Sequence, residues 1–324
     1  MTGQTILITG GSGTFGAAMT RYALEHGAAR VICLSRGEHR QAQLRHQIDD
    51  PRLETWIGDV RDRERLRWAF RVRPDVVIHA AALKRVEVCE QHSMEAVKTN
   101  VDGTRNVVEE AMLADVPTVL VISSDKATSP ETTYGKTKAA AEDIALSQNA
   151  MRGSGETRVS VVRYGNVAGS QGSFIETLLR ARQTGEPVRL TDPAATRFWW
   201  DIEAAVAFVA DVLRDMRGAE IWIPRLPSAR MDAFARALAP NSEQIVTGMR
   251  GSEKVHEAMI NATESAYCWE LPDRFVLLPK AGQWWSPEPP AGAVKVQAGF
   301  SYASDHDPTV PEVQDTPCPT FASQ

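Results

Sequence analysis

Cysteine is scarce in this sequence, and its few cysteines form no recognisable pattern. Only four occur in 324 residues, at positions 33, 89, 268 and 318. They are far apart and lack metal-type spacing, and a protein held together by disulfides carries many more. We therefore expect neither a metal site nor a disulfide framework, and a reducing compartment such as the cytoplasm suits the chain.

Long apolar runs and a basic bias are also missing. The apolar run at 5–9 has the length of a strand and ends in glycines, so we expect neither a signal peptide nor a membrane span. The net charge is -5 with both signs scattered, which excludes the basic stripe of a nucleic-acid-binding protein. The expected partner is therefore a small molecule, and neither a nucleic acid nor a membrane.

What the sequence does contain is a regular alternation of short apolar runs with segments of helical periodicity. Its apolar fraction of 43% is enough for the core of one large or two modest domains. The alternation is typical of a parallel sheet covered by helices on both faces. It predicts an α/β protein with a Rossmann-type doubly wound sheet, whose strands cover residues 5–9, 30–34, 53–57, 75–79, 118–123 and 158–163.

After residue 166 the alternation breaks down, which indicates a smaller, interleaved substrate-binding domain. The chain becomes rich in proline, glycine and serine towards its end, so we expect the last dozen residues to be mobile. The expected division is a cofactor-binding domain at 1–165 that 198–224 rejoins, a substrate-binding region at 166–197 and 225–300, and a C-terminal extension at 301–324.

The first apolar run leads into a glycine-rich turn, which predicts a dinucleotide site. Gly10 would permit the tight turn, Gly13 the close approach of a pyrophosphate, and Gly16 the packing of helix against strand. Free backbone N–H groups and a helix N-terminus at such a turn bind phosphate. The cofactor contacts expected here are Thr9, Gly10, Gly13, Thr14, Phe15 and Gly16.

The end of the second strand bears on the choice between NAD and NADP. Where chains that bind NAD usually have an acidic residue, this one has Ser35 and Arg36. An arginine fork and a serine hydroxyl suit a ribose 2′-phosphate, so we expect NADP, with NAD as the less favoured alternative. Further cofactor contacts are expected at the ends of the third and fourth strands, at Asp59, Val60, Ala80 and Ala81.

Tyr134 and Lys138 lie four residues apart and so share one face of a predicted helix. A lysine ammonium can lower the pKa of a neighbouring phenol, which lets the tyrosine take a proton from a hydroxyl as hydride leaves the same carbon. Together with the glycine-rich turn, the pair resembles the active site of the extended short-chain dehydrogenase/reductase superfamily. The resemblance implies a nicotinamide cofactor in contact with both residues.

The fifth strand ends in Ser124, Asp125 and Lys126, at the edge where open parallel sheets bind their ligands. A simple oxidoreductase needs only the serine. Adjacent residues at a strand end tend to project to opposite sides, so the acid and the base could flank one sugar ring. Once C4 of a sugar is a ketone, Lys126 could remove the C5 proton while Asp125 protonates the leaving C6 hydroxyl. This requires burial to lower the pKa of the lysine and to favour the protonated carboxyl.

Several motifs together resemble the soluble inverting UDP-N-acetylglucosamine 4,6-dehydratases of the polysaccharide biosynthesis family. The similarity covers about residues 5–259 and extends to 299–305. The motifs are Ser-Ser-Asp-Lys-Ala at 123–127, Tyr-Gly-Lys-Thr-Lys at 134–138, Val-Val-Arg-Tyr-Gly-Asn-Val at 161–167, Thr-Arg-Phe-Trp at 196–199 and Glu-Lys-Val-His-Glu at 253–257.

Membership of this family would imply a lyase that oxidises C4, removes water across C5 and C6, returns hydride to C6 and inverts C5, in the synthesis of bacterial surface or secondary-metabolite sugars. Asp125 and Lys126 would then eliminate the water, with Tyr134 as their partner. Lys84 would lie near the sugar, and the uridine diphosphate would be held by Asn166, Arg197, Arg250 and Glu253.

Other functions of the same fold stay open. In a nucleotide-sugar 4-epimerase or reductase, Asp125 and Lys126 would be idle, whereas a non-enzymatic NADP sensor would ordinarily lack the tyrosine or the lysine. The chain also has Ser124 and Arg250-Gly251-Ser252 where the family often has threonine and Arg-Pro-Gly. Helices at 94–113 and 134–149 resemble those that pair subunits in this superfamily, so we expect a homo-oligomer, a dimer or larger.

Overall fold

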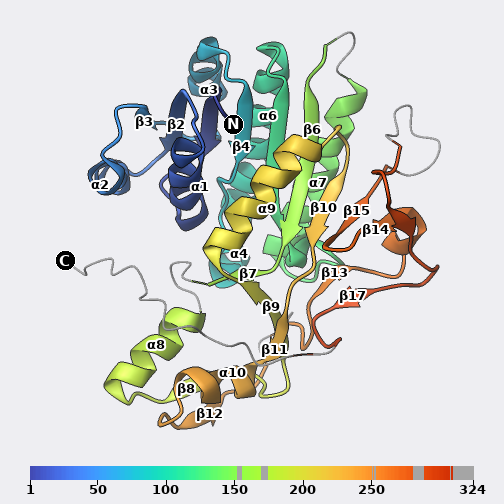
Figure 1. Ribbon diagram of the computed structural model, residues 1–324. Coiled ribbons are helices and arrows are strands. Elements are labelled where there is room, and N and C mark those ends of the chain that lie inside the picture. The colour runs from blue at the N-terminus through green and yellow to red at the C-terminus, as the bar shows by residue number, and fades with distance from the viewer. Residues whose placement is uncertain are drawn as a thin grey trace.

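The computed structural model describes residues 1–151, 155–168, 174–249, 251, 253–279, 288–306 and 308. These residues form a large sheet with helices on both faces and a smaller part below it (Figure 1). None of the helices among them combines the length and the apolar character that a membrane crossing requires. The last dozen residues, which we expected to be mobile, lie outside the described residues, as does Cys318.

The centre of the large sheet is a run of parallel strands in the order β3-β2-β1-β4-β5-β6-β10. This is the doubly wound dinucleotide-binding order extended by one strand, so the predicted α/β fold class is confirmed. The strands are β1 (Thr5–Thr9), β2 (Arg30–Ser35), β3 (Leu53–Ile57), β4 (Val76–His79), β5 (Thr118–Ser124), β6 (Arg158–Tyr164) and β10 (Ile221–Pro224).

Apolar side chains on both faces of these strands are buried beneath helices. Ile6, Leu7 and Ile8, for example, are consecutive and all are fully buried, as expected of a sheet covered twice. Helices α1 and α9 cover one face, and α3, α6 and α7 cover the other (Figure 1). The helices of this part are α1 (Thr14–Glu25), α2 (Glu38–Ile48), α3 (Arg63–Ala69), α4 (Val86–Gln91), α5 (Ser93–Ala96), a π-helical turn (Val97–Asp102), α6 (Gly103–Leu113), α7 (Thr133–Ser147) and α9 (Ile202–Asp215).

Three antiparallel strands from the C-terminal part extend the sheet beyond β10. They are β15 (Arg274–Leu277), β14 (Cys268–Glu270) and β16 (Val294–Lys295). The sequence analysis placed all three in the substrate-binding region, whereas in the structure they belong to the large sheet. Phe275 and Val276 are buried there, and β15 covers the edge of β10 that would otherwise be exposed.

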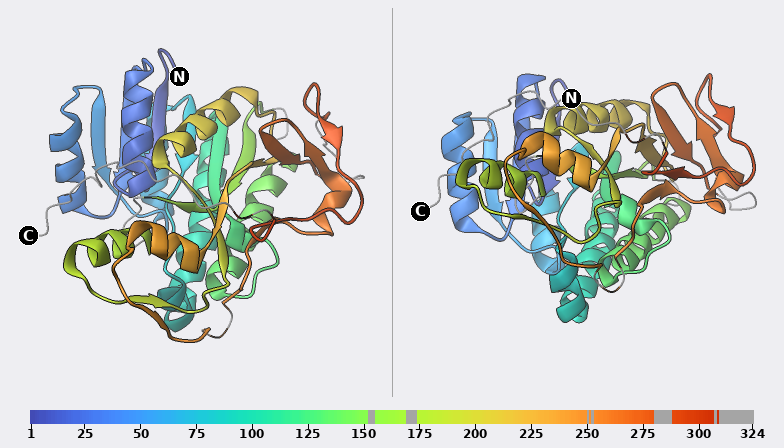
Figure 2. Two further views of the ribbon diagram at one scale, coloured as in Figure 1. Left: turned by 60° about the horizontal axis from the view of Figure 1, so that its bottom comes forward. Right: turned by 90° about the horizontal axis from the view of Figure 1, so that it is seen from below.

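The smaller part lies next to the carboxyl ends of the parallel strands (Figures 1 and 2). Leu178, Val188, Phe234 and Leu238 belong to its own small hydrophobic core. Its elements are α8 (Phe174–Thr184), β8 (Val188–Leu190), α10 (Met231–Leu238) and β12 (Gln244–Val246). Short strands connect it to the large sheet: β7 (Asn166–Val167), β9 (Thr196–Trp200), β11 (Ser228–Arg230), β13 (Ala258–Ile260) and β17 (Tyr302–Ala303).

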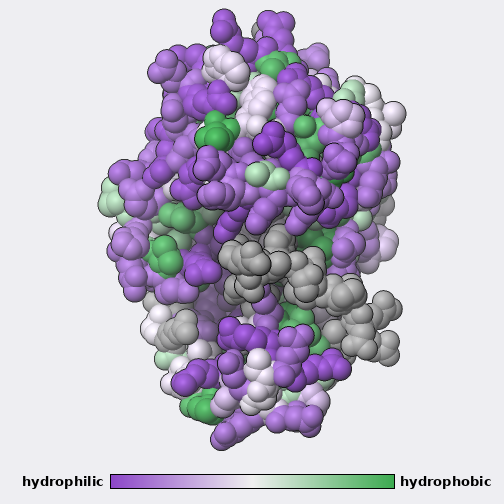
Figure 3. Space-filling model, turned by 90° about the vertical axis from the view of Figure 1, so that its left-hand side faces the viewer, coloured by the Kyte–Doolittle hydropathy of each residue, from purple (hydrophilic) through white to green (hydrophobic). Residues whose placement is uncertain are grey.

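The side of the molecule that carries α2 and β3 is mostly hydrophilic, and its apolar residues are scattered (Figure 3). Isolated apolar side chains of this kind are normal on a protein surface. We therefore expect the functional site between the two parts of the molecule, and not on this face.

Candidate active site

A cavity of about 1280 Å³ lies at the carboxyl ends of the parallel strands, between the large sheet and the smaller part. Ligands of open α/β sheets bind at this edge. Its wall contains most of the residues predicted from the sequence: Gly10, Gly13, Thr14, Phe15, Gly16, Ser35, Arg36, Asp59, Val60, Ala80, Ala81, Lys84, Ser124, Lys126, Tyr134, Lys138, Asn166, Arg197 and Glu253.

The glycine-rich turn is packed too tightly for side chains. Gly10 has a φ of +71°, and a Cβ placed on it would lie 2.8 Å from Ala81 N. A Cβ on Gly16 would lie 2.5 Å from Gly10 O, so the turn and helix α1 touch backbone to backbone. Gly13 is the N-cap of α1 and lines the cavity, which leaves the N-terminus of this helix open to a phosphate.

Thr9 is not brought to the cavity. It is fully buried, and its Oγ1 lies 2.7 Å from Nδ1 of His79, which is equally buried on the neighbouring strand β4. The prediction that Thr9 contacts the cofactor is therefore not supported by its side chain, because the hydroxyl faces the interior of the sheet.

The end of β2 is held by polar side chains around Ser35. Gln41, buried on α2, donates from Nε2 to both the carbonyl and the hydroxyl of Ser35, and Ser12 of the glycine-rich turn donates to the same hydroxyl at 2.8 Å. Arg36 and Arg40 both line the cavity beside it. Arg40 was missed by the sequence analysis, although its position one helical turn after Arg36 is a readable signal.

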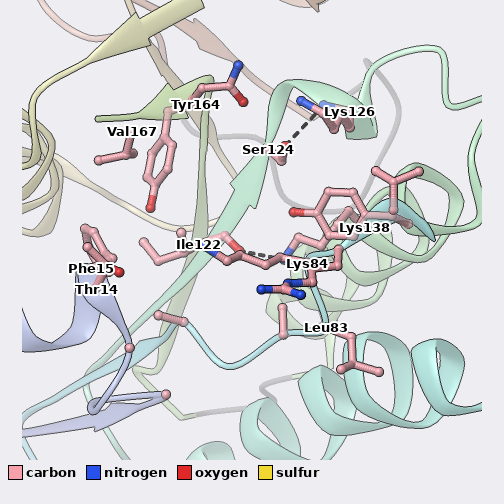
Figure 4. Close-up of a pocket in the computed structure, with 18 of the residues that line it drawn as sticks. Thr14, Phe15, Leu83, Lys84, Ile122, Ser124, Lys126, Lys138, Tyr164 and Val167 are labelled. Carbon is pink, nitrogen blue, oxygen red and sulfur yellow. Dashed lines mark hydrogen bonds between the residues drawn. The ribbon is translucent and has the colours of Figure 1, made fainter. Parts of the chain in front are cut away.

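Helix α7 supplies Tyr134 and Lys138 to the same cavity. Figure 4 shows Lys138 there, beside Ile122. Its N-cap is Thr132, whose side chain accepts a hydrogen bond from the backbone N–H of Gly135. Nζ of Lys138 donates to the carbonyl of Ile122 at 2.7 Å. Burial lowers the pKa of Lys138 to about 8, against the opposing effect of the nearby Glu142 carboxylate.

The electrostatics of Tyr134 differ from the prediction. Burial raises its pKa to about 12, and the groups that oppose this shift are the Lys126 ammonium and a hydrogen bond with Ser124. The sequence analysis assigned this effect to Lys138. The ammonium of Lys138 is instead directed at a backbone carbonyl, so Lys126 is the lysine that favours the phenolate.

Ser124 and Lys126 line the cavity, whereas the carboxyl of Asp125 lies behind them. Oδ1 of Asp125 accepts a hydrogen bond from Ser124 Oγ at 2.7 Å and lies 3.1 Å from Lys126 Nζ. Asp125 Oδ2 is buried, and no described residue offers it a hydrogen bond. The prediction that the acid and the base flank a ring from opposite sides is wrong here, because residues Asp125–Ala127 form a 3₁₀ turn that brings the two groups together.

The charge of Lys126 also departs from the prediction. Burial disfavours the ammonium, but the carboxylates of Asp125 and Glu257 outweigh this effect and raise the pKa of Lys126 above its usual range. We expected a lowered pKa. The expectation failed because Asp125 pairs directly with Lys126, and because Glu257, whose Oε1 lies 3.7 Å from Lys126 Nζ, adds a second carboxylate from a distant part of the chain.

The predicted substrate residues reach the cavity from several segments. Lys84 follows β4, and burial together with Arg85 and Arg40 lowers its pKa. Asn166 is exposed at the start of β7, and Glu253 accepts a hydrogen bond from Thr191 at 3.0 Å. Arg250 lies outside the described residues.

Arg197 on β9 has a structural task that its sequence motif did not reveal. Its Nη1 donates to the carbonyls of Thr196 and Val255 at 2.7 and 2.9 Å, and its Nη2 donates to the carbonyl of Lys254 at 3.0 Å. The guanidinium therefore fixes the backbone of the segment that carries Glu253 and Glu257. Another cavity arginine, Arg189 on β8, was missed; its flanking residues are buried while it is exposed.

Comparisons with known proteins identify the family of this chain. Residues 6–279 match the family model described as "Polysaccharide biosynthesis protein". A "UDP-N-acetylglucosamine 4,6-dehydratase (inverting)" of Campylobacter jejuni is 38% identical over 313 residues, which cover 94% of this chain and 93% of that protein. A "UDP-glucose 4-epimerase" of Rickettsia rickettsii is 35% identical over 280 residues, 84% of this chain and 82% of that protein.

A solved structure shows the same fold over nearly the whole chain. The X-ray structure of Pen from Bacillus thuringiensis superimposes with a TM-score of 0.87 at 30% sequence identity, covering 95% of this chain and 94% of that one. The match to the family model spans most of the described sheet and the cavity residues. The chain therefore belongs to the polysaccharide biosynthesis protein family.

Proposed function

We propose that this protein is a nucleotide-sugar 4,6-dehydratase that acts on UDP-N-acetylglucosamine with NADP as its cofactor. The observation that carries the proposal is the contact of Asp125 with Lys126 beside the Tyr134–Lys138 pair, next to a glycine-rich turn in one cavity. A simple reductase has no use for the additional acid and base. The similarity to the Campylobacter jejuni dehydratase supports the same substrate class.

The residues around the glycine-rich turn fit a dinucleotide. The backbone of Gly10, Gly13 and Gly16 would hold the pyrophosphate, and Ser35 and Arg36 the ribose end. When bound, the nicotinamide would accept hydride from C4 of the sugar and return it to C6.

The side chains of this chain would move the protons. Tyr134 would take the proton of the C4 hydroxyl, favoured as phenolate by the Lys126 ammonium and by Ser124. Lys126 must be neutral to take the C5 proton. It would become neutral by giving its own proton to Asp125 across their 3.1 Å contact, which also leaves the carboxyl protonated, as the elimination requires. Ser124 donates to the Asp125 carboxylate. Once Asp125 is protonated, it would donate its proton to Ser124 Oγ while Ser124 passes its own proton to the departing C6 hydroxyl.

The other predicted assignments enter the same proposal. Lys84 would lie near the sugar and Asn166, Arg197 and Glu253 near the diphosphate, each on the cavity wall. The smaller part would thus bind the nucleotide while the large sheet binds the cofactor. We keep the homo-oligomer and the role in surface or secondary-metabolite sugar synthesis as predictions.

The proposal is tested by incubation with UDP-N-acetylglucosamine in heavy water, without added reduced cofactor. We expect a product lighter by one water that carries deuterium at C5, because the proton lost in the elimination is replaced from solvent. Mass spectrometry and proton NMR of the product provide the measurement. A C4 epimer of unchanged mass would contradict the proposal and favour an epimerase, the activity named for the Rickettsia relative.

The choice of NADP predicts a specific loss in two arginine variants. Arg36→Ala and Arg40→Ala should each weaken NADP binding by about tenfold and leave NAD binding nearly unchanged, since an exposed charge-assisted contact to phosphate contributes on the order of 1–2 kcal/mol. The measurement is the Kd of each cofactor by calorimetry. The control is Arg45→Ala, because Arg45 lies on α2, the helix of Arg40, but does not line the cavity. Equal losses for both cofactors would show that the arginines do not read the 2′-phosphate.

A further inference from the structure

The catalytic lysine of the proposed mechanism has a second carboxylate partner that no motif in the sequence assigned to it. Oε1 of Glu257 lies 3.7 Å from Lys126 Nζ, and its side chain is only 6% exposed. Its other oxygen, Oε2, is buried and has no hydrogen-bond partner among the described residues. Such an oxygen is costly to bury, which suggests that the carboxylate is kept for its effect on the lysine.

The cluster contains more negative than positive charge. Two buried carboxylates, of Asp125 and Glu257, lie within 4 Å of Lys126, and no other cation of the described residues forms an ion pair with either of them. The remaining charged or titratable groups that act on Lys126 are Tyr134 on α7 and Arg197 on β9. The ammonium is therefore held between an acid on its own turn and an acid on the segment before β13.

The backbone of Glu257 is fixed by the C-terminal segment. Its N–H donates to Ser304 Oγ at 3.0 Å, and its carbonyl accepts from the backbone N–H of Ser304 at 2.8 Å. Ser304 is fully buried, and its Oγ lies 2.7 Å from Thr196 Oγ1. The C-terminal segment, which pairs through β17 with β13, thus fixes the backbone from which the glutamate side chain reaches the lysine.

We propose that Glu257 is a positioning residue of the elimination step, which holds the Lys126 ammonium beside Asp125 and sets the pH range in which Lys126 becomes a base. This inference rests on the proposed function, in which Lys126 takes the C5 proton. Glu257 itself does not line the cavity, so it acts through the lysine and not on the sugar.

The sign of the effect follows from the charge. A negative charge near an ammonium favours its protonated form, so removal of that charge lets Lys126 lose its proton at lower pH. Glu257→Gln keeps the shape of the side chain and removes the charge. The ascending limb of the kcat profile should move to lower pH by on the order of one unit, with KM for the nucleotide sugar unchanged.

Two further variants test whether charge or mere packing is responsible. Glu257→Asp keeps the charge, so the ascending limb of its kcat profile should lie closer to that of wild type than the limb of the Gln variant does. Glu220→Gln removes another buried carboxylate, one that hydrogen-bonds Ser160 and is absent from the cavity wall, and should leave the limb in place. A Glu257→Gln profile that superimposes on wild type, or a change in KM alone, would overturn the inference.

If the Gln variant does not fold, Ser304→Ala, which loosens the same glutamate, must shift the ascending limb of the kcat profile in the same direction, and an unmoved limb overturns the inference.

A readout without turnover separates this inference from the proposed function. Competitive acetylation of the lysines, read by peptide mass spectrometry as a function of pH, reports the titration of Lys126 directly. Its midpoint should fall in Glu257→Gln relative to wild type. If wild type loses no water from UDP-N-acetylglucosamine while this midpoint still moves, the proposed function fails, and only the effect of Glu257 on the titration of Lys126 stands. If instead the enzyme removes water but the midpoint does not move in Glu257→Gln, the proposed function stands and the inference about Glu257 is overturned.

Discussion

Lys126→Ala should reduce the loss of water from UDP-N-acetylglucosamine by at least about 10³-fold, because it removes the base and the partner that protonates Asp125 together. C4 oxidation should become slower, because the Lys126 ammonium favours the phenolate of Tyr134, but it should persist, since Tyr134, Ser124 and Lys138 remain in the cavity wall. Mixing the variant with the nucleotide sugar should therefore accumulate reduced cofactor, visible by its near-ultraviolet absorbance, while no lighter product forms.

The variant should keep its cofactor but lose stability. Lys126 follows β5 and makes its charged contacts with Asp125 and Glu257, neither of which belongs to the glycine-rich turn after β1. Its removal leaves two buried carboxylates without a cation, which should lower the free energy of unfolding by about 3 kcal/mol. Thermal denaturation with and without NADP measures both effects.

An exposed lysine provides the matched control for this result. Lys98 on the π-helical turn pairs with Glu95 at the surface, and Lys98→Ala should leave both activity and stability nearly unchanged. Loss of the cofactor in Lys126→Ala would mean that the lysine is structural. Undiminished water loss would remove the dehydratase mechanism altogether.

The parallel sheet was predictable from the sequence because its strands are buried on both faces. Runs such as Ile6–Leu7–Ile8 are apolar at every position, and the glycines that follow stop the strand and turn the chain into a helix. The same local signals located the fourth, fifth and sixth strands. The last two strands on the β10 side of the sheet, β14 and β16, are too short for any such pattern, since three and two residues show no periodicity.

The sequence predicted which residues line the site, but not the direction in which the pKa of Lys126 is shifted. Strand ends and glycine spacing are local features, so they brought Ser124, Lys126 and Tyr134 to one edge of the sheet. The pKa of Lys126 depends on Glu257, which only the fold brings near. The 3₁₀ turn that pairs Asp125 with Lys126 likewise depends on how this turn packs against helix α7.

That packing leads to the second large effect, expected for Gly135→Ala. Gly135 follows Tyr134 in α7, and a Cβ on it would overlap the carbonyl oxygen of Lys126 and lie 3.1 Å from Pro130 Cβ. Either the helix or the turn must move. Since a misplacement of about 1 Å in an active site costs on the order of 10²-fold in rate, we expect kcat to fall by about that factor.

Helix propensity alone makes the opposite prediction for stability. Alanine is about 1 kcal/mol more favourable than glycine inside a helix, so a freely exposed helix would be stabilised by the change. Overpacking against a backbone carbonyl costs about 1–3 kcal/mol, and here the obstacle is backbone rather than a flexible side chain. The clash should therefore outweigh the propensity, and the variant should unfold at lower temperature than wild type.

Lys136→Ala places an alanine in the same turn of α7 at an exposed position and separates the two effects. It should leave kcat near the wild-type value and change the melting temperature little, because the side chain of Lys136 is exposed. If Gly135→Ala were instead as active as wild type and more stable, the turn that carries Asp125 and Lys126 would not be packed against α7, and the close coupling of the acid, the base and the tyrosine would be refuted.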